Sequence, residues 1–261
     1  MMGKLIAGIL GLMFAGPIGL FVGLFVGHQF DRGLGGLTQP MSRAQQQRIS
    51  DSFFVTVFSL LGHLAKSDGR ISKAEINQAE ALMARMGLTA QHRREAIELF
   101  QGGAQPDFSL DQTMQAFVAI CGRQKNLKRS LLNYLIALAL ADGELHIAER
   151  QALQKIAAYL GFSEALFSRL LEMIMAQAQF KGSGGTSAPN SASQLQAAYK
   201  ALGVSDSQTD AEIKRAYRKL LSENHPDKLI GQGMPADMVK LATERTQEIR
   251  KAYETIVASR Q

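Results

Sequence analysis

The sequence contains little cysteine and no loop of the kind that binds nucleotide phosphates. Cys121 is the one cysteine among 261 residues. It excludes an internal disulfide and a zinc site built from cysteine ligands, and it favours a reducing compartment. No Gly-Lys-Ser/Thr phosphate loop is present, so we expect no nucleotide hydrolysis, no enzyme activity and no cofactor.

Alternating apolar and polar residues, the pattern of a half-buried strand, are also missing. From residue 48 to about residue 179, apolar residues recur every three or four positions, which is the period of an amphipathic helix. Apolar residues make up 46% of the chain and charged residues 20%, so wholesale disorder is excluded. The prediction is an all-α protein.

The net charge of +6 permits an acidic partner. Nucleic acid, anionic lipid and an acidic protein surface all fit this charge. The charge balance does not choose among them.

One long apolar run stands at the start of the chain. Residues 5–27 read LIAGILGLMFAGPIGLFVGLFVG, without a charge, and a helix of this length crosses a hydrocarbon core of about 30 Å. The prediction is a transmembrane helix. A secretory signal peptide, which has a shorter apolar core and a cleavage site, and a buried core helix are the alternatives.

Positive charges around this run predict its orientation. Lys4 precedes the run, whereas Arg32, Arg43 and Arg48 follow it. Because positive residues favour the cytoplasmic side, we expect a periplasmic N-terminus with the bulk of the chain in the cytoplasm.

Small residues recur at every fourth position of the same run. Such a register forms a helix face on which a second backbone can approach closely, which is how helices associate in lipid. We therefore expect a homodimer formed through the transmembrane helix. The residues in this register are Gly3, Ala7, Gly11, Ala15, Gly19, Gly23 and Gly27.

The middle of the chain contains an internal repeat. Residues 64–89 match residues 138–163 at a constant offset, and both copies contain an Asp-Gly turn and a later glycine. Gly87 and Gly161 are expected to end helices, with Thr89 and Ser163 capping the next ones. The duplicated pattern resembles the TerB-like all-helical domain of tellurite-resistance proteins, and the resemblance implies a fold more than a function.

The acidic residues of the two turns allow two interpretations. Helix capping explains Glu75 and the turn residues without any ligand. Alternatively, the two turns converge on a divalent cation, although each offers fewer oxygens than calcium requires. The candidate ligands are Asp68, Glu75, Asp142 and Glu149.

The last segment predicts a helical hairpin. Residues 211–224 carry an apolar stripe, and residues 235–259 carry a second stripe that can pack on it. We expect Asp210 to cap the first of these helices. Cations crowd the rest of its surface: Lys214, Arg215, Arg218 and Lys219.

A histidine, a proline and an aspartate stand together in the connection of this hairpin. Proline disfavours helix and lacks a backbone donor, which explains Pro226 and leaves His225 and Asp227 unexplained. Four stretches in order, AYKALGV, EIKRAYRKLL, His-Pro-Asp and IRKAYETI, resemble the J domain of DnaJ-type Hsp70 co-chaperones. That resemblance implies signalling to Hsp70 by His225, Pro226 and Asp227.

The same resemblance implies docking of Hsp70 on the basic helix. The docking residues that it implies are Lys214, Arg215, Tyr217, Arg218 and Lys219. Two departures from the usual pattern are a longer segment after Asp227 and Thr246 at a position where an aromatic residue commonly packs.

The domain order resembles the DjlA family of membrane-anchored DnaJ-like proteins. The resemblance implies a single-pass type III protein of the bacterial inner membrane that acts with DnaK and is linked to envelope and capsule stress responses. The expected parts are an anchor (1–31), a juxtamembrane hinge (32–47), a TerB-like domain (48–180), a flexible linker (181–193) and a J domain (194–261).

Two other functions compete with this prediction. The TerB-like domain could sense a divalent metal or stress, with the J domain as its output. The basic helix could instead bind nucleic acid, but it lacks aromatic residues between its cations for base stacking and leaves His225 and Asp227 without a role. We therefore expect no nucleic-acid partner.

Overall fold

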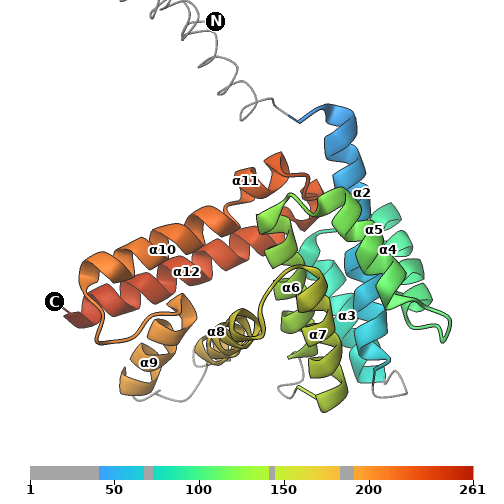
Figure 1. Ribbon diagram of the computed structural model, residues 1–261. Helices are drawn as coiled ribbons and strands as arrows, with labels where there is room; N and C mark the ends of the chain where they lie inside the picture. The colour runs from blue at the N-terminus through green and yellow to red at the C-terminus, as the bar shows by residue number, and fades with distance from the viewer. Residues whose placement is uncertain (1–40, 68–72, 141–144, 183–190, 261) are drawn as a thin grey trace, which may run out of the picture. The chain divides into compact units, whose positions relative to one another are not determined.

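A computed structural model describes residues 41–67, 73–140, 145–182 and 191–260, and every regular element in these ranges is helical. The all-α prediction is confirmed. The elements (Figure 1) are α2 (Arg43–Ala65), α3 (Lys73–Met86), α4 (Ala90–Gly103), α5 (Leu110–Cys121), α6 (Lys125–Ala139), α7 (Ile147–Tyr159), α8 (Glu164–Gly182), α9 (Ser191–Leu202), α10 (Asp210–Asn224), α11 (Pro226–Gly231), η1 (Ala236–Met238) and α12 (Val239–Arg260).

The chain divides into two compact units, Met1–Gln45 and Gln46–Gln261. The predicted span at residues 5–27, with its small-residue register, lies outside the described residues. Within the ranges that are described, no helix is long and apolar enough to cross a membrane. Helix α2 begins at Arg43, inside the segment predicted as a hinge.

Helix α2 belongs to the group of helices α2–α8, which we call the helical domain. Phe53, on this helix, is fully buried and lies close to the rings of Phe117 on α5 and Tyr134 on α6. Burial raises the pKa of the neighbouring Cys121 thiol to about 11. This core is apolar and keeps its cysteine protonated, so the thiol is unreactive in the folded chain.

Two glycines allow α2 and α4 to pack closely. A Cβ atom at Gly62 would collide with the backbone carbonyl of Phe100, and one at Gly103 would collide with the carbonyl of Ser59. Any larger residue at either position would push the two helices apart. The glycines therefore set the distance between these helices.

The repeated helix ends have the expected geometry. Gly87 and Gly161 have φ angles of 79° and 80°, in the left-handed region that favours glycine. Thr89 accepts a hydrogen bond from the backbone of His92 at 3.2 Å, and Ser163 caps α8 in the same way. The sequence prediction of these stops and caps is confirmed.

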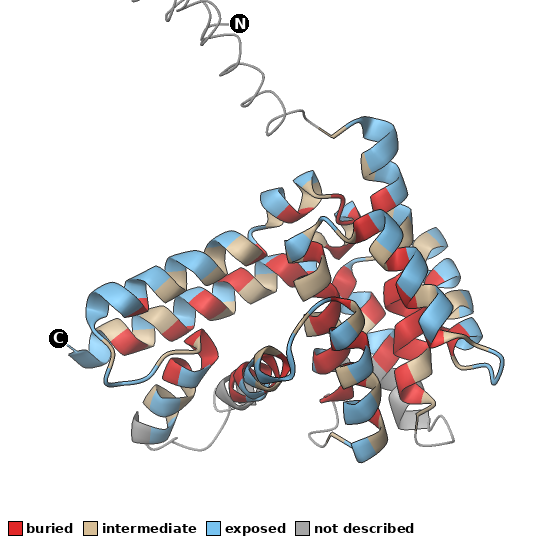
Figure 2. Cartoon of the chain, in the orientation of Figure 1, coloured by how far each residue is buried: buried red, intermediate tan, exposed pale blue. Residues whose placement is uncertain are grey.

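Helices α9, α10 and α12 build a small C-terminal core. Helix α12 packs against both α9 and α10, and the outward face of α10 is exposed along most of its length (Figure 2). The buried residues of this cluster are Ala198, Tyr199, Ala201, Leu202, Ile213, Ile249, Ala252 and Ile256. The predicted packing of the two stripes is confirmed.

Three local predictions were wrong. The N-cap of α10 is Thr209, and Asp210 is the first helical residue. The segment after the tripeptide, expected as a loop, forms helix α11, which starts at Pro226 because proline is well tolerated in the first turn of a helix. The expected helix at residues 235–259 is divided into η1 and α12.

Candidate functional site

His225 joins α10 to α11 and caps the second of these helices. Its backbone is extended, with φ −63° and ψ 127°, and its Nδ1 accepts a hydrogen bond from the backbone N–H of Asp227 at 3.2 Å. Pro226 follows at the first helical position, where a missing N–H is harmless. Asp227 then lies in the first turn, where the helix dipole favours negative charge.

The tripeptide is accessible to a partner. The side chain of His225 is 47% exposed and that of Asp227 is 89% exposed. Because Nδ1 of His225 accepts a hydrogen bond, the proton of a neutral imidazole belongs on Nε2. The site thus offers a nitrogen donor and an exposed carboxylate, whose oxygen lies 3.9 Å from Nδ1 of His225.

The predicted cations of α10 lie on one face of that helix. Lys214 and Arg218 are four residues apart, as are Arg215 and Lys219, so the pairs stand in adjacent rows. All four residues are exposed, whereas Ile213 on the opposite side is 2% exposed. The result is a positive surface next to the tripeptide, formed by Lys214, Arg215, Arg218 and Lys219, which we call the basic face.

Tyr217 lies beside the basic face but packs within the hairpin. Its ring is stacked on that of Tyr253 from α12, with centroids 4.2 Å apart and planes 9° apart. The residue is only partly exposed. Its visible role is to fix α10 on α12, which holds the four cations in place.

The start of α10 is closed by a capping box. The Thr209 hydroxyl accepts from the backbone of Glu212, while the Glu212 carboxylate accepts from the backbone N–H of Thr209 at 2.8 Å. Hydrogen bonds from the backbone and side chain of Thr209 lower the pKa of Glu212. The carboxylate is therefore ionised in the folded chain at neutral pH.

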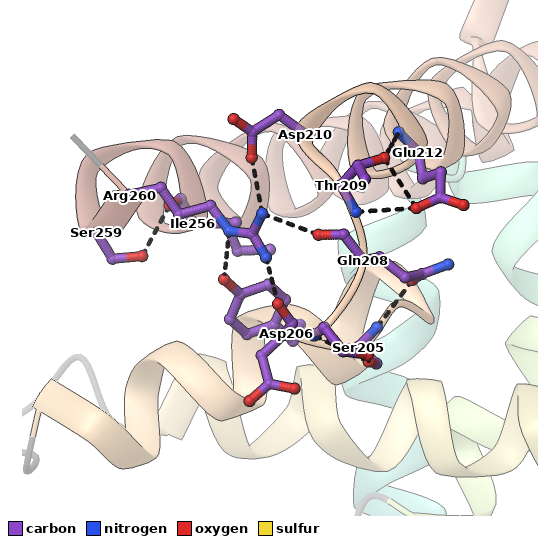
Figure 3. Close-up of polar contacts among 11 residues, drawn as sticks. Ser205, Asp206, Gln208, Thr209, Asp210, Glu212, Ile256, Ser259 and Arg260 are labelled. Carbon is purple, nitrogen blue, oxygen red and sulfur yellow. Dashed lines mark hydrogen bonds and ion pairs between the residues drawn. The ribbon is translucent and has the colours of Figure 1, made fainter.

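Arg260, at the end of α12, ties the helix to the loop that precedes α10 (Figure 3). Its guanidinium donates to the Tyr199 hydroxyl at 2.7 Å, to the carbonyl of Asp206 at 2.6 Å and to the Asp210 carboxylate at 2.7 Å. Hydrogen bonds to Tyr199 and Asp210 raise its pKa. One side chain thus connects α9, the loop and α10.

Thr246 is buried in α12, at 7% exposure. Its hydroxyl donates to the carbonyl of Thr243 at 2.7 Å, which satisfies the polar group inside its own helix. The helix continues through this position, so the hairpin packs without an aromatic residue there.

The structure describes the side chain of one of the four candidate metal ligands. Asp68, Asp142 and the side chain of Glu75 lie outside the described residues, and Glu149 accepts a hydrogen bond from the backbone of His146 at 3.0 Å as part of a capping box. No group of three potential ligands is found in the part of the chain that the structure describes. Capping therefore accounts for Glu149.

One ion pair next to the tripeptide was not foreseen from the sequence. Arg129 on α6 pairs with Glu223, two residues before His225, and both side chains are about four-fifths buried. The two residues are 94 positions apart. No local pattern signals such a contact, which depends on how the helical domain and the hairpin pack.

Models of three protein families match consecutive parts of the chain. The co-chaperone DjlA transmembrane domain matches residues 1–43, tellurite resistance protein TerB matches residues 54–172, and the DnaJ domain matches residues 197–261. A curated co-chaperone protein DjlA from Coxiella burnetii is 41% identical over 97% of this chain and 96% of its own length. The chain belongs to the DjlA family of co-chaperones.

Other members of the family match over the same extent. The DjlA protein of Yersinia pseudotuberculosis is 40% identical, and that of Vibrio cholerae is 38% identical, each over 97% of this chain and 96% of the relative. No solved structure matches the chain. Residues 1–43 correspond to the transmembrane domain of the DjlA family.

Proposed function

We propose that this membrane-anchored co-chaperone stimulates the ATPase of an Hsp70, DnaK, at the cytoplasmic face of the bacterial inner membrane. The observation that carries the proposal is the exposed His-Pro-Asp connection beside the basic face of α10. Both features lie within the part of the chain that matches the DnaJ domain.

The two parts of the surface have different tasks. The four cations of α10 steer an acidic surface of DnaK into position, which mainly raises the association rate. His225 and Asp227 then contact the docked partner as hydrogen-bond donor and acceptor. Hydrolysis takes place in DnaK, since the sequence of this chain contains no Gly-Lys-Ser/Thr phosphate loop.

The anchor concentrates this activity at the membrane. A tethered J domain meets DnaK and membrane clients at a raised effective concentration without needing higher affinity. We place the clients in envelope and capsule stress responses. A strain that lacks the protein tests this assignment, because a capsule reporter should be restored by the unaltered chain and not by His225→Gln.

Single-turnover ATP hydrolysis by DnaK tests the proposal. The full chain in detergent should accelerate hydrolysis, and His225→Gln should remove nearly all of the acceleration while leaving helix content unchanged. Glu254→Gln, an exposed change in the C-terminal half of α12, is the control. An active His225→Gln protein would contradict the proposal.

We also propose that the anchor self-associates through its small-residue face and leaves the N-terminus in the periplasm. Gly19→Leu with Gly23→Leu should weaken association in a membrane two-hybrid assay, because bulky side chains block close helix approach. Leu20→Ile, outside the register, is the matched control. Unchanged association would defeat the dimer.

A further inference from the structure

The segment after the tripeptide packs on the helical domain. Met234 is 3% exposed, and its sulfur lies 3.8 Å from the hydroxyl of Tyr134 on α6. Gly233, with φ 99°, approaches Ile49 so closely that a Cβ would lie 2.6 Å from the Ile49 side chain. This segment is therefore one of the places where the J domain contacts the helical domain, in addition to the packing of α9 on α8.

Polar contacts hold the same junction together. His92 on α4 pairs with Asp237 in η1, and Arg85 on α3 pairs with Glu244 on α12 at 2.7 Å. The side chain of Gln46 donates to the carbonyl of Ile230 at 2.8 Å. The junction therefore uses directional bonds as well as apolar packing.

Both helices that meet at His225 are held by the helical domain. Arg129 binds Glu223 in the last turn of α10, and the contacts of Gly233 and Met234 hold the chain that follows α11. Helix α11 has only six residues, and a helix this short is unstable in water without tertiary contacts. Contacts with the helical domain thus add to those that α11 makes with α10 and α12.

The junction leaves the proposed Hsp70 surface uncovered. His225, Asp227 and the basic face remain exposed while the helical domain contacts the residues on either side. In Figure 1, α10 runs along α12, and α11 leads from its end. The helical domain thus supports the tripeptide without blocking it.

We propose that the helical domain is a second support for the His-Pro-Asp connection and that Arg129 is a positioning residue for signalling to Hsp70. By pairing with Glu223, Arg129 fixes the end of α10, while the docked segment fixes α11. A connection held at both ends loses less conformational freedom when DnaK binds. The signalling half of this proposal rests on the proposed function, whereas the docking half does not.

The test combines two measurements on the full chain in detergent. Amide hydrogen exchange at residues 227–234 reports docking, and single-turnover hydrolysis by DnaK, titrated with the chain, reports signalling. The variants are Arg129→Glu, Glu223→Arg, the two together, and the conservative Arg129→Lys. Arg93→Glu is the matched control, because Arg93 pairs with Glu80 inside the helical domain, 3.7 Å apart.

Arg129→Glu should raise exchange at residues 227–234 and lower maximal stimulation by about tenfold, the scale of a lost bond to a charged group. Arg129→Lys should retain most stimulation. The double charge reversal should restore both readouts relative to Arg129→Glu, and Arg93→Glu should change neither. If the double charge reversal restores maximal stimulation, Arg129 positions the tripeptide. If it restores only the concentration needed for half-maximal stimulation, the pair affects the docking of DnaK instead.

Three results would overturn the proposal. Unchanged exchange in Arg129→Glu would show that the segment is not docked through this pair. Raised exchange with unchanged or increased stimulation would show that docking does not support signalling. If the unaltered chain fails to stimulate DnaK, the proposed function and the role of Arg129 in signalling fail together, and the exchange result still decides the docking.

Discussion

The helical domain and the J domain use their side chains differently. In the helical domain, large aromatic residues are fully buried, among them Phe53, Phe58, Phe117 and Phe167. In the core of the J domain, three of the eight buried residues are alanines, and its distinctive residues lie on the surface. Stability and signalling should therefore be separable by mutation in the J domain.

The largest loss of stability is expected in the aromatic core. Phe53→Ala should lower the free energy of unfolding by about 3–5 kcal/mol, because it removes a fully buried ring between α2, α5 and α6. Urea denaturation followed by circular dichroism measures this. Val55→Ala, at a 40% exposed position of the same helix, is the control, and equal losses would show that the ring is not central.

A smaller loss is expected in the J-domain core. Ile249 is 1% exposed, and Ile249→Ala should destabilise by about 2–4 kcal/mol because it removes buried apolar atoms and leaves a cavity. Hydrogen exchange in α9 and α10 should rise. If the exposed neighbour change Arg250→Ala had the same effect, packing would not explain the loss.

The cap of α10 should contribute less again. Thr209→Ala removes the hydroxyl that accepts the Glu212 N–H and should cost about 1 kcal/mol, measured by urea denaturation. Thr243→Ala, at an exposed site within α12, should have almost no effect. An unchanged free energy of unfolding in Thr209→Ala would show that the capping box does not stabilise the hairpin.

The pH dependence of the stability of the helical domain tests the lowered pKa of one histidine, His63. Burial, aided by Lys155, lowers the pKa of His63 from 6.5. The unfolded chain therefore binds a proton at this histidine more readily than the folded chain does. The stability contributed by the neutral His63 is present above pH 6.5 and is lost as the pH falls through the lower pKa of the folded state. His63→Gln should make the urea midpoint fall less between pH 7 and pH 5, and identical pH slopes would contradict the assignment.

The smallest change in stability is expected on the basic face. Lys214→Ala with Arg218→Ala should change the free energy of unfolding by less than about 0.5 kcal/mol for each residue, since both are exposed. A higher concentration of this variant should be needed for half-maximal stimulation of DnaK. That concentration should also depend less on salt than it does for the unaltered chain. A large loss of stability would show that the basic face contributes to folding as well as to signalling.

The structural features that depend on residues close together in the chain could be predicted from the sequence. Helix period, the stops at Gly87 and Gly161, and the stripes of the hairpin are all encoded within a few turns of chain. The tripeptide and its cations were likewise visible, because their order along the chain is specific.

Contacts between distant residues were not predictable. The pairing of Arg129 with Glu223 joins residues 94 positions apart, and the docking of Gly233 on Ile49 depends on how two domains pack. The resemblance to the J domain implied docking for Tyr217, and its stacking on Tyr253 was not foreseen. Local pattern cannot decide between two faces that a residue borders.

Single-turnover ATP hydrolysis by DnaK with Asp227→Asn tests the separation of signalling from stability most directly. The change removes one charge at a side chain that is 89% exposed and keeps its size. We predict that stimulation is lost while the urea midpoint stays that of the unaltered chain. Full stimulation by Asp227→Asn, or a loss explained by unfolding, would contradict the role of this carboxylate.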